Sequence, residues 1–480
     1  MSHNFIVRSQ EALTNEQLQS ALAKAGGGFV ARRQSAIDQV PDFEQMRDQA
    51  QAVRQKSLAN LDIYLAYFEQ QVEAAGGKVH WARSPEDLRR IVIGICQQAG
   101  ARTIAKGKSM VGEEAHLNAA LEAAGMIPWE TDLGEYILQL AQEPPSHIVA
   151  PALHKTKAEI EALFRNAHQL GERDLQEVKA IVDEARDVIR ERFLTADVGI
   201  TGANMLIAET GTAVLVTNEG NGDLSSCLPK THIITTTFDR VVPTWEDASK
   251  IIRVLARSAT GQPITSYTSF FSGPKGENDH DGPEAFHVVL LDNHRSEILA
   301  SDYREMLHCI RCGACMNHCP VYQAVGGHAY DSVYPGPMGA VLSPLLRGYP
   351  QDYELPNASS FCGRCESVCP VRIPLPGLMR KLREQERQVA PPPRVNRTLL
   401  SSFAWLASKP ALYRRLTSAG SWLLHKLGRG KGRLHKVPLA RGWSQQRELP
   451  LPQGASFQSQ WEQHLKDKAK KSSPQGGGRG

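Results

Sequence analysis

Residues Cys309 to Pro320 read CIRCGACMNHCP, and residues Cys362 to Pro370 read CGRCESVCP. The first run has the spacing C-x2-C-x2-C-x3-C-P, which is typical of bacterial ferredoxins that bind paired [4Fe-4S] clusters. Zinc sites usually use separated C-x2-C pairs, without a third cysteine and a following Cys-Pro, so zinc is disfavoured. Disulfides are disfavoured as well, because we expect no secretory signal and cytosolic disulfides are rare. The two runs therefore predict an iron–sulfur electron carrier.

The two runs are expected to exchange ligands. When they are aligned from their Cys-Pro ends, three cysteines of each run match, and Ser359 falls opposite Cys309. In the ferredoxin pattern the last cysteine of a run ligates the other cluster. The first of two [4Fe-4S] clusters should then be held by Cys309, Cys312, Cys315 and Cys369. The second should be held by Cys319, Cys362 and Cys365, so one of its ligands is missing.

Four explanations of the missing ligand remain open at the level of sequence. The Ser359 hydroxyl could fill the place, and so could Cys227 from an earlier part of the chain. A partner protein could supply a group, or the place could stay empty and leave a three-iron cluster. Because ligation, hydrogen bonding and exposure set cluster potentials, the two clusters should differ in potential.

Length and composition indicate a soluble protein of more than one domain. The chain has 480 residues, 41% of them hydrophobic, and no apolar stretch approaches the roughly 20 residues that span a bilayer. We expect it to be cytoplasmic, where thiols stay reduced. The net charge is +4, but residues 391–480 carry 17 Lys and Arg against 3 Asp and Glu, which leaves −10 for residues 1–390. A basic tail therefore follows an acidic body.

The sequence predicts an α/β domain over residues 62–298, after an N-terminal helical segment at 1–61. Strands alternate with helices, which indicates a parallel sheet. Helices are expected at 43–75, from Pro85 after a Ser84 cap, and at 113–124, 174–193 and 245–257. Strands are expected at 78–82, 102–105, 126–129, 231–242 and 286–291, with a β-rich stretch at 198–217.

The iron–sulfur module should occupy residues 299–385. Its two cysteine runs are separated by an insert, residues 326–356, that is rich in Gly, Pro and Tyr. The insert suits tight turns near a buried inorganic core, although a plain surface loop fits it equally well. Residues 386–480 form the basic tail, in which residues 466–480 should be disordered.

Two short amphipathic helices are expected in the tail, one around Leu399 and Phe403 and the other around Leu416 and Leu423. A basic surface with Trp and Leu on the opposite side suits an anionic membrane or an acidic partner. Packing on the acidic body of the same chain is an equally good interpretation. Nucleic-acid binding is not expected, because the tail has no recognisable motif that reads DNA.

Several motifs together resemble the iron–sulfur subunit of the bacterial L-lactate utilisation system, lactate utilisation protein B. They are CIRCGAC from Cys309, CPVY from Cys319, GGHAY from Gly326, YPGP from Tyr334 and FCGRC from Phe361. The segments KGKSM from Lys106, ETDLGEY from Glu130 and AETGT from Ala208 resemble its lactate utilisation domain. The resemblance covers nearly the whole chain and is weakest in the tail.

The resemblance implies an α/β domain like that of CoA transferases and sugar-phosphate isomerases, followed by an α-helical ferredoxin-type module. It implies a role in oxidising L-lactate to pyruvate with two partner proteins, one rich in cysteine and one sharing the lactate utilisation domain. The family's seven cluster cysteines match the seven named above, so the missing ligand is a family trait. A stand-alone transferase or isomerase with structural clusters is the alternative.

Three further residues have functional interpretations beside simpler ones. Glu209 could be a nucleophile, as in CoA transferases of similar fold, but a solvated turn residue is favoured. Lys106 and Lys108 follow a strand, where they could bind a carboxylate or phosphate or simply face solvent. No G-x-G-x-x-G or Walker loop is present, so a nucleotide cofactor is not supported.

The remaining candidate site residues are Cys96, which lies outside the two runs, and two histidines beside the first run. Cys96 continues the apolar face of its helix and should be a buried structural thiol. His308 and His318 each adjoin a cysteine of the first run. They could tune a potential through hydrogen bonds, although exposed imidazoles at the module surface are favoured.

Overall fold

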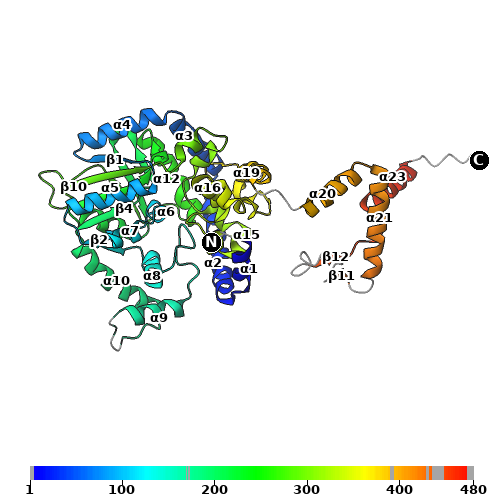
Figure 1. The fold of residues 1–480 in the computed structure, drawn as a ribbon, viewed down its shortest axis with the longest axis horizontal. Helices are drawn as coiled ribbons and strands as arrows, with labels where there is room; N and C mark the ends of the chain where they lie inside the picture. Colours follow the sequence, from blue (N-terminus) through cyan, green and yellow to red (C-terminus); the bar gives the residue numbers. More distant parts are fainter. Residues whose placement is uncertain are drawn as a thin grey trace, which may run out of the picture. The chain divides into compact units, whose positions relative to one another are not determined.

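The computed structural model describes residues 5–168, 170, 173–389, 394–428, 432–434 and 448–472. Figure 1 shows the course of the chain, which divides into two compact units at residue 390. The first unit contains both cysteine runs and a layered α/β structure, and the second contains the basic tail.

A six-stranded parallel sheet forms the centre of the first unit, with the strand order β1-β10-β7-β4-β2-β3 (Figure 1). The strands are β1 Lys78–Ala82, β2 Thr103–Lys106, β3 Ile127–Glu130, β4 Val198–Thr201, β7 Thr231–Thr237 and β10 Ala285–Leu291. The predicted parallel α/β class is confirmed. Burial of β4 and β7 along their whole lengths explains their rows of β-branched residues.

The chain reverses its direction across the sheet between β2 and β4. From β2 it moves to the edge strand β3, whereas from β4 it moves through β7 to β10 on the other side. In open parallel sheets, a ligand crevice forms at such a reversal, beyond the carboxyl ends of the strands. The loops after β2 and β4 are therefore the first places to look for a ligand.

A second sheet, of four strands, packs within the same unit in the order β8-β5-β6-β9. Its strands are β5 Met205–Ile207, β6 Thr212–Thr217, β8 Val241–Val242 and β9 Tyr267–Phe271. The strand expected at 231–242 is interrupted, because the 3-10 turn η2 Phe238–Arg240 separates β7 from β8. This turn carries Asp239 and Arg240 beneath the first cysteine run.

Two predicted helices are each broken in two. The helix expected at 43–75 is α3 Phe43–Ala59 and α4 Leu61–Ala74, because Asn60 leaves helical geometry at φ −130° and ψ 39°. The helix expected at 113–124 is α6 Met110–Glu114 and α7 Leu117–Ala123, with His116 left-handed between them at φ 50°. Hydrophobic periodicity continues across both breaks, which is why it does not reveal them.

Three other predicted helices form close to their expected positions, as α5, α10 and α12, whereas α8, α9, α11 and α13 were not predicted. Ser84 caps α5 by accepting a hydrogen bond from the Asp87 N–H, as predicted. The bounds are α5 Pro85–Gln98, α8 Leu133–Ala141, α9 Lys157–Ala167, α10 Val178–Thr195, η1 Ala208–Thr210, α11 Asn221–Cys227, α12 Trp245–Ala259 and α13 Arg295–Leu299.

Short helices build the region that carries the cysteine runs. They are η3 Arg304–His308, α14 Ala314–Asn317, α15 Pro320–Val325, η4 His328–Tyr330, α16 Gly336–Arg347, α17 Tyr349–Asp352, η5 Leu355–Asn357, α18 Arg364–Ser367 and α19 Leu375–Val389. The N-terminal helices α1 Phe5–Thr14 and α2 Glu16–Asp38 pack against this region, where Gln19 donates to the Ala324 carbonyl at 2.8 Å.

The insert between the runs is part of the core and is not a surface loop. Most of α16 is buried, and Tyr330 and Tyr334 are 1% exposed. Gly336 has φ 75°, and a Cβ there would lie 2.4 Å from the Met316 side chain. The insert therefore packs directly on α14, the short helix that carries Cys315.

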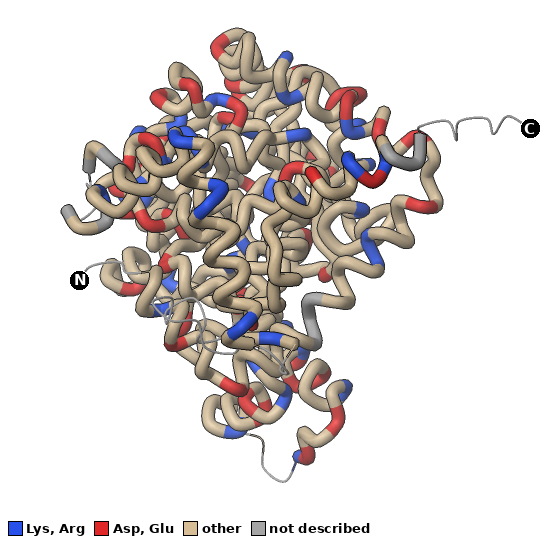
Figure 2. The backbone as a smooth tube through the Cα atoms, turned by 90° about the vertical axis from the view of Figure 1, so that its right-hand side faces the viewer, with Lys and Arg blue, Asp and Glu red and all other residues tan. Residues whose placement is uncertain are grey.

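The tail unit contains α20 Arg394–Ala407, α21 Pro410–Leu427, α23 Phe457–Ser472 and the short strands β11 Arg433–Leu434 and β12 Leu449–Pro450. The first two are the amphipathic helices predicted, and Phe403 and Trp422 on them are more than half exposed. Within the expected disordered end, residues 466–472 are helical, and residues 473–480 lie outside the described part. None of the described helices is long and apolar enough to span a membrane. Figure 2 shows both signs of charge interspersed along the described chain.

Candidate metal centre

The two cysteine runs share one backbone conformation. Gly313 and Gly363 are left-handed at φ 74° and 76°, and the residues two positions earlier, Arg311 and Phe361, are left-handed at φ 57° and 54°. A four-residue helix follows each glycine. A non-glycine residue rarely adopts positive φ, so its occurrence at both matching positions marks a required shape.

The first cysteine set consists of Cys309, Cys312, Cys315 and Cys369, and the structure brings these four thiols together. Burial, with smaller contributions from Cys369 and Cys309, raises the pKa of Cys312 to about 12. Burial also raises the pKa of Cys315 well above its usual value, with added contributions from Cys309, Cys312, Cys369 and, from the second run, Cys365. The last cysteine of the second run thus lies beside the first three of the first run.

The second cysteine set consists of Cys319, Cys362 and Cys365, which also lie near one another. Burial and then Cys319 raise the pKa of Cys365 to about 12, and Cys362 contributes as well. Cys362 itself is exposed, and its pKa is lowered, first by the backbone N–H of Arg364. Clustered thiols with raised pKa values are unfavourable as thiolates unless a metal binds them.

Arginine side chains bind the backbone around the first set. Arg47 donates from two nitrogens to the Cys369 carbonyl at 2.8 and 3.1 Å, and Arg240 donates to the Cys309 carbonyl at 2.6 Å. Arg33 donates to the Val368 carbonyl at 3.0 Å, and burial lowers its pKa to about 10. Arg54, which is 1% exposed, donates to the Leu307 carbonyl at 2.9 Å. Sequence reasoning missed all four, because they lie far from the runs and follow no local pattern.

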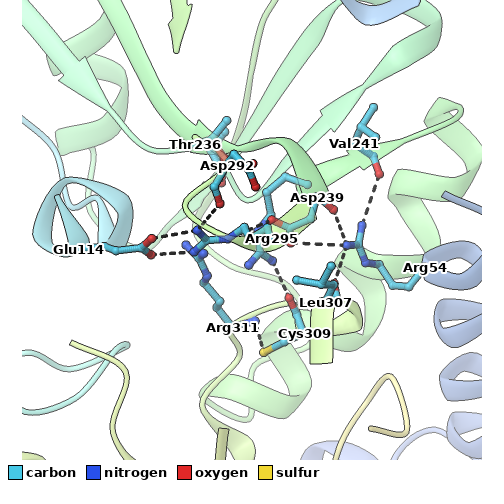
Figure 3. Close-up of polar contacts among 12 residues, drawn as sticks. Arg54, Glu114, Thr236, Asp239, Val241, Asp292, Arg295, Leu307, Cys309 and Arg311 are labelled. Carbon is cyan, nitrogen blue, oxygen red and sulfur yellow. Dashed lines mark hydrogen bonds and ion pairs between the residues drawn. The ribbon is translucent and has the colours of Figure 1, made fainter. Parts of the chain in front are cut away.

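Positive charge exceeds negative charge among the side chains beneath the first run. Figure 3 shows Arg54, Arg295 and Arg311 gathered around Asp239 and Glu114, close to Cys309. Arg295 pairs with Glu114 at 2.7 Å and with Asp239 at 3.5 Å. Burial alone would raise the pKa of Asp239, but the arginines outweigh it and lower that pKa to about 2. With Arg240 included, four arginines face two carboxylates, a surplus that suits a cluster with negatively charged thiolate ligands.

The two histidines beside the first run differ from expectation, and the two other cysteines stay apart from both sets. His308 and His318 are buried, so the favoured interpretation of exposed imidazoles is wrong. Burial lowers the pKa of His308 to about 4, and His318 contacts the Ala314 carbonyl at 2.9 Å. Cys96 is fully buried, as predicted, and burial raises its pKa to about 12. Cys227 ends α11, where its electrostatic neighbours are Asp281 and Asp223.

A cavity of about 610 Å³ lies at the reversal point of the sheet and reaches the first set. The loops after β2 and β4 line it, together with Arg240, Arg311 and Cys312 on the other wall. Lys108 lines it as well and donates to the Val149 carbonyl at 3.0 Å. Asp132 and Glu219 are its carboxylates, and burial followed by Asp132 raises the pKa of Glu219 to about 7. The sequence signalled Lys108 but not Glu219 or the two arginines.

Two of the other predicted site residues lie outside this cavity. Lys106 is buried and pairs with Glu130 at 2.5 Å and with Glu113 at 2.9 Å, so it neither faces solvent nor is open to a ligand. Glu209 is exposed and accepts a hydrogen bond from the Trp245 N–H at 3.2 Å. The solvated-turn interpretation of Glu209 therefore fits.

Outside the cysteine sets, three side chains of metal-ligand types lie close together among the described residues. The ligand atoms of Glu143, His154 and His328 lie within 4.8 Å of one another. Lys155 already pairs with the Glu143 carboxylate at 2.5 Å, and the His328 ring contacts the Pro144 carbonyl at 2.8 Å. These contacts satisfy the group without a metal.

Comparison with known proteins identifies two regions of the chain. Residues 65–291 match the model of the LUD domain, and residues 305–373 match the model of a 4Fe-4S dicluster domain. "Lactate utilization protein B" of Geobacillus sp. WCH70 is 42% identical and covers 96% of this chain and 98% of its own length. The protein of the same name from Lysinibacillus sphaericus C3-41 is also 42% identical, covering 96% and 97%. The "uncharacterized electron transport protein YkgF" of Escherichia coli K12 is 42% identical with the same coverage.

Proposed function

This chain belongs to the lactate utilisation protein B family, and on that premise we propose that it is an iron–sulfur electron-transfer subunit for the oxidation of L-lactate to pyruvate. The observation that carries the proposal is the gathering of seven thiols into two sets on a repeated backbone. When bound, [4Fe-4S] clusters would supply one-electron redox chemistry at these sets.

The residues present fit such clusters. We propose that Cys309, Cys312, Cys315 and Cys369 hold one cluster and that Cys319, Cys362 and Cys365 contribute to the other. Backbone N–H groups reach the sulfurs, as at Cys369, which accepts from the Ile373 N–H at 3.4 Å. The arginine surplus near the first set supports the binding of a group with net negative charge, and it tends to raise a cluster's potential.

The cavity supports a role for this chain near the substrate as well as in electron transfer. Its four cations, Arg32, Lys108, Arg240 and Arg311, suit a small organic carboxylate, and its wall includes Cys312. Glu219, with a pKa near neutrality, could accept a hydrogen bond or a proton from a hydroxyl beside that carboxylate. We infer that lactate, pyruvate or a related carboxylate docks here, close to the first set.

The family relationship also bears on partners. We propose that the chain works with a cysteine-rich subunit and with a second subunit that contains a lactate utilisation domain. Exposed apolar residues on the basic helices α20 and α21 suit a peripheral contact with an anionic membrane. Binding of the full chain to vesicles with and without anionic lipid, compared with a chain ending at residue 390, tests this contact.

The proposed function is tested with the whole chain, reconstituted anaerobically with iron and sulfide. Electron paramagnetic resonance (EPR) of the reduced protein should show two reducible clusters, and a single one or none would contradict the proposal. A strain that lacks the gene should fail to grow on L-lactate. The wild-type gene and the Cys96→Ala variant should restore growth, whereas Cys312→Ala should not.

A further inference from the structure

Ser359 occupies in the second run the place that Cys309 occupies in the first. The Cys309 Sγ accepts a hydrogen bond from the Arg311 backbone N–H at 3.4 Å. The Ser359 Oγ accepts the same bond from the Phe361 backbone N–H at 3.1 Å. Because Arg311 and Phe361 share left-handed backbones, the two acceptor atoms are held by the same local turn.

The backbone carbonyls at the two positions are also held in the same way. Arg240 donates to the Cys309 carbonyl at 2.6 Å, and Arg383 donates to the Ser359 carbonyl at 3.4 Å. The Arg383 guanidinium also lies 4.1 Å from the centroid of the Phe361 ring, which fixes one of the two residues between Ser359 and Cys362. Cys309 and Ser359 are both half-buried. The equivalence therefore extends from the side-chain atom to the backbone and its arginine partner.

The other sources of a ligand have less support. Cys227 has Asp281 and Asp223 as electrostatic neighbours, and the cluster cysteines are not among them. Ser360 is exposed, and its side chain already hydrogen-bonds to Cys362. Ser360 also aligns with Ile310, which is not a ligand position in the first run.

We propose that the Ser359 oxygen is the fourth protein ligand of the cluster bound by Cys319, Cys362 and Cys365. On ligation an Fe–O bond forms, the Ser359 O–H bond breaks and its proton passes to solvent, as for other metal ligands that must deprotonate. Arg383 next to Ser359 favours the resulting negative charge. The assignment rests on the proposed cluster binding and specifies the one ligand that the seven cysteines do not supply.

The test uses the full chain, reconstituted anaerobically, as wild type and as Ser359→Ala, Ser359→Cys and the matched control Ser360→Ala. We expect wild type and Ser360→Ala to hold two four-iron clusters. Ser359→Ala should lose one iron per chain and show the EPR signal of an oxidised three-iron cluster, while the signal of the first set stays unchanged. Ser359→Cys should keep both clusters but shift the EPR and Mössbauer parameters of the second alone.

Two results would overturn the assignment. One is a Ser359→Ala protein with the iron content and EPR spectrum of wild type. The other is a Ser359→Cys protein whose second cluster has unchanged spectra, which remains informative if the alanine variant does not fold. A wild-type chain that binds no cluster would contradict the proposed function itself, and is thus distinct from a failure at Ser359 alone.

Discussion

The first and second cysteine sets are built on the same turn and short helix, but their surroundings differ. Four cysteines form the first set, and arginines from three distant parts of the chain bind the backbone around it. The second set has three cysteines, one of them, Cys362, exposed to solvent. The repeat therefore fixes the backbone around the cysteines, whereas the packing partners fix the local charge and the solvent access. Two sites of equal shape should consequently differ in stability and potential.

The largest expected effect comes from removing single cysteines, because it separates the two sets. Cys369→Ala should abolish the same EPR signal as Cys309→Ala, although Cys369 belongs to the second run. Cys319→Ala should instead alter the signal that depends on Cys365. If Cys369→Ala affected the signal of its own run, ligands would not be exchanged between the runs.

The next effect concerns stability, because Arg54 is buried and Arg383 is partly exposed. Arg54→Met would leave three backbone carbonyls without their donor and Asp239 short of a partner, at a cost of about 3–5 kcal/mol in free energy of unfolding. Arg383→Met should cost about 1 kcal/mol. Anaerobic unfolding in guanidinium chloride measures both free energies. Equal losses of stability in the two variants would show that the arginines around the two sets contribute equally.

Cluster potential provides a third comparison. Removing the buried charge in Arg240→Leu should lower the potential of the first cluster by about 90 mV, since a charge about 8 Å away at an effective dielectric constant of ~20 contributes about 2 kcal/mol. Arg364→Leu beside the exposed Cys362 should lower the second potential by only about 20 mV, because water screens it. Redox titration followed by EPR gives both values. If Arg364→Leu shifted the second potential as much as Arg240→Leu shifts the first, solvent exposure would not distinguish the two sites.

The smallest effect concerns pH and the cavity, which reaches only the first set. Below a pH of about 7 Glu219 becomes neutral in the folded protein, so the cavity loses a negative charge as pH falls. Pyruvate should therefore bind roughly fivefold more tightly at a pH of about 6 than at about 8, equivalent to about 1 kcal/mol. Isothermal titration should show that Glu219→Gln removes this dependence and that the exposed Glu209→Gln keeps it.

Pyruvate should also perturb the EPR spectrum of the first set and leave that of the second unchanged. Two results would contradict the binding of pyruvate beside Cys312. One is a pyruvate affinity that still depends on pH in Glu219→Gln, and the other is an equal perturbation of the EPR signals of both sets.

Sequence predicted what depends on local spacing. The seven cysteines, the Ser84 cap and the strands of the parallel sheet follow from patterns a few residues long. The breaks at Asn60 and His116 were missed because apolar periodicity continues through them. Burial of the insert could not be decided, since Gly and Pro suit both a surface loop and close packing. Arg47 and Arg240 reach the cysteines only through tertiary folding, so no local pattern revealed them.

Glu114 has a consequence for how far this protein can be divided. Its carboxylate pairs with Arg295 after the last strand of the α/β layer and accepts a hydrogen bond from Tyr334 of the insert at 2.5 Å. A ferredoxin fragment that begins at residue 299 would lose this carboxylate. In the other fragment, residues 1–298, the Glu114–Arg295 pair would become exposed to water. We therefore do not expect the iron–sulfur region to fold as an independent domain. A minimal electron carrier derived from this chain would have to retain the N-terminal helices and the parallel sheet.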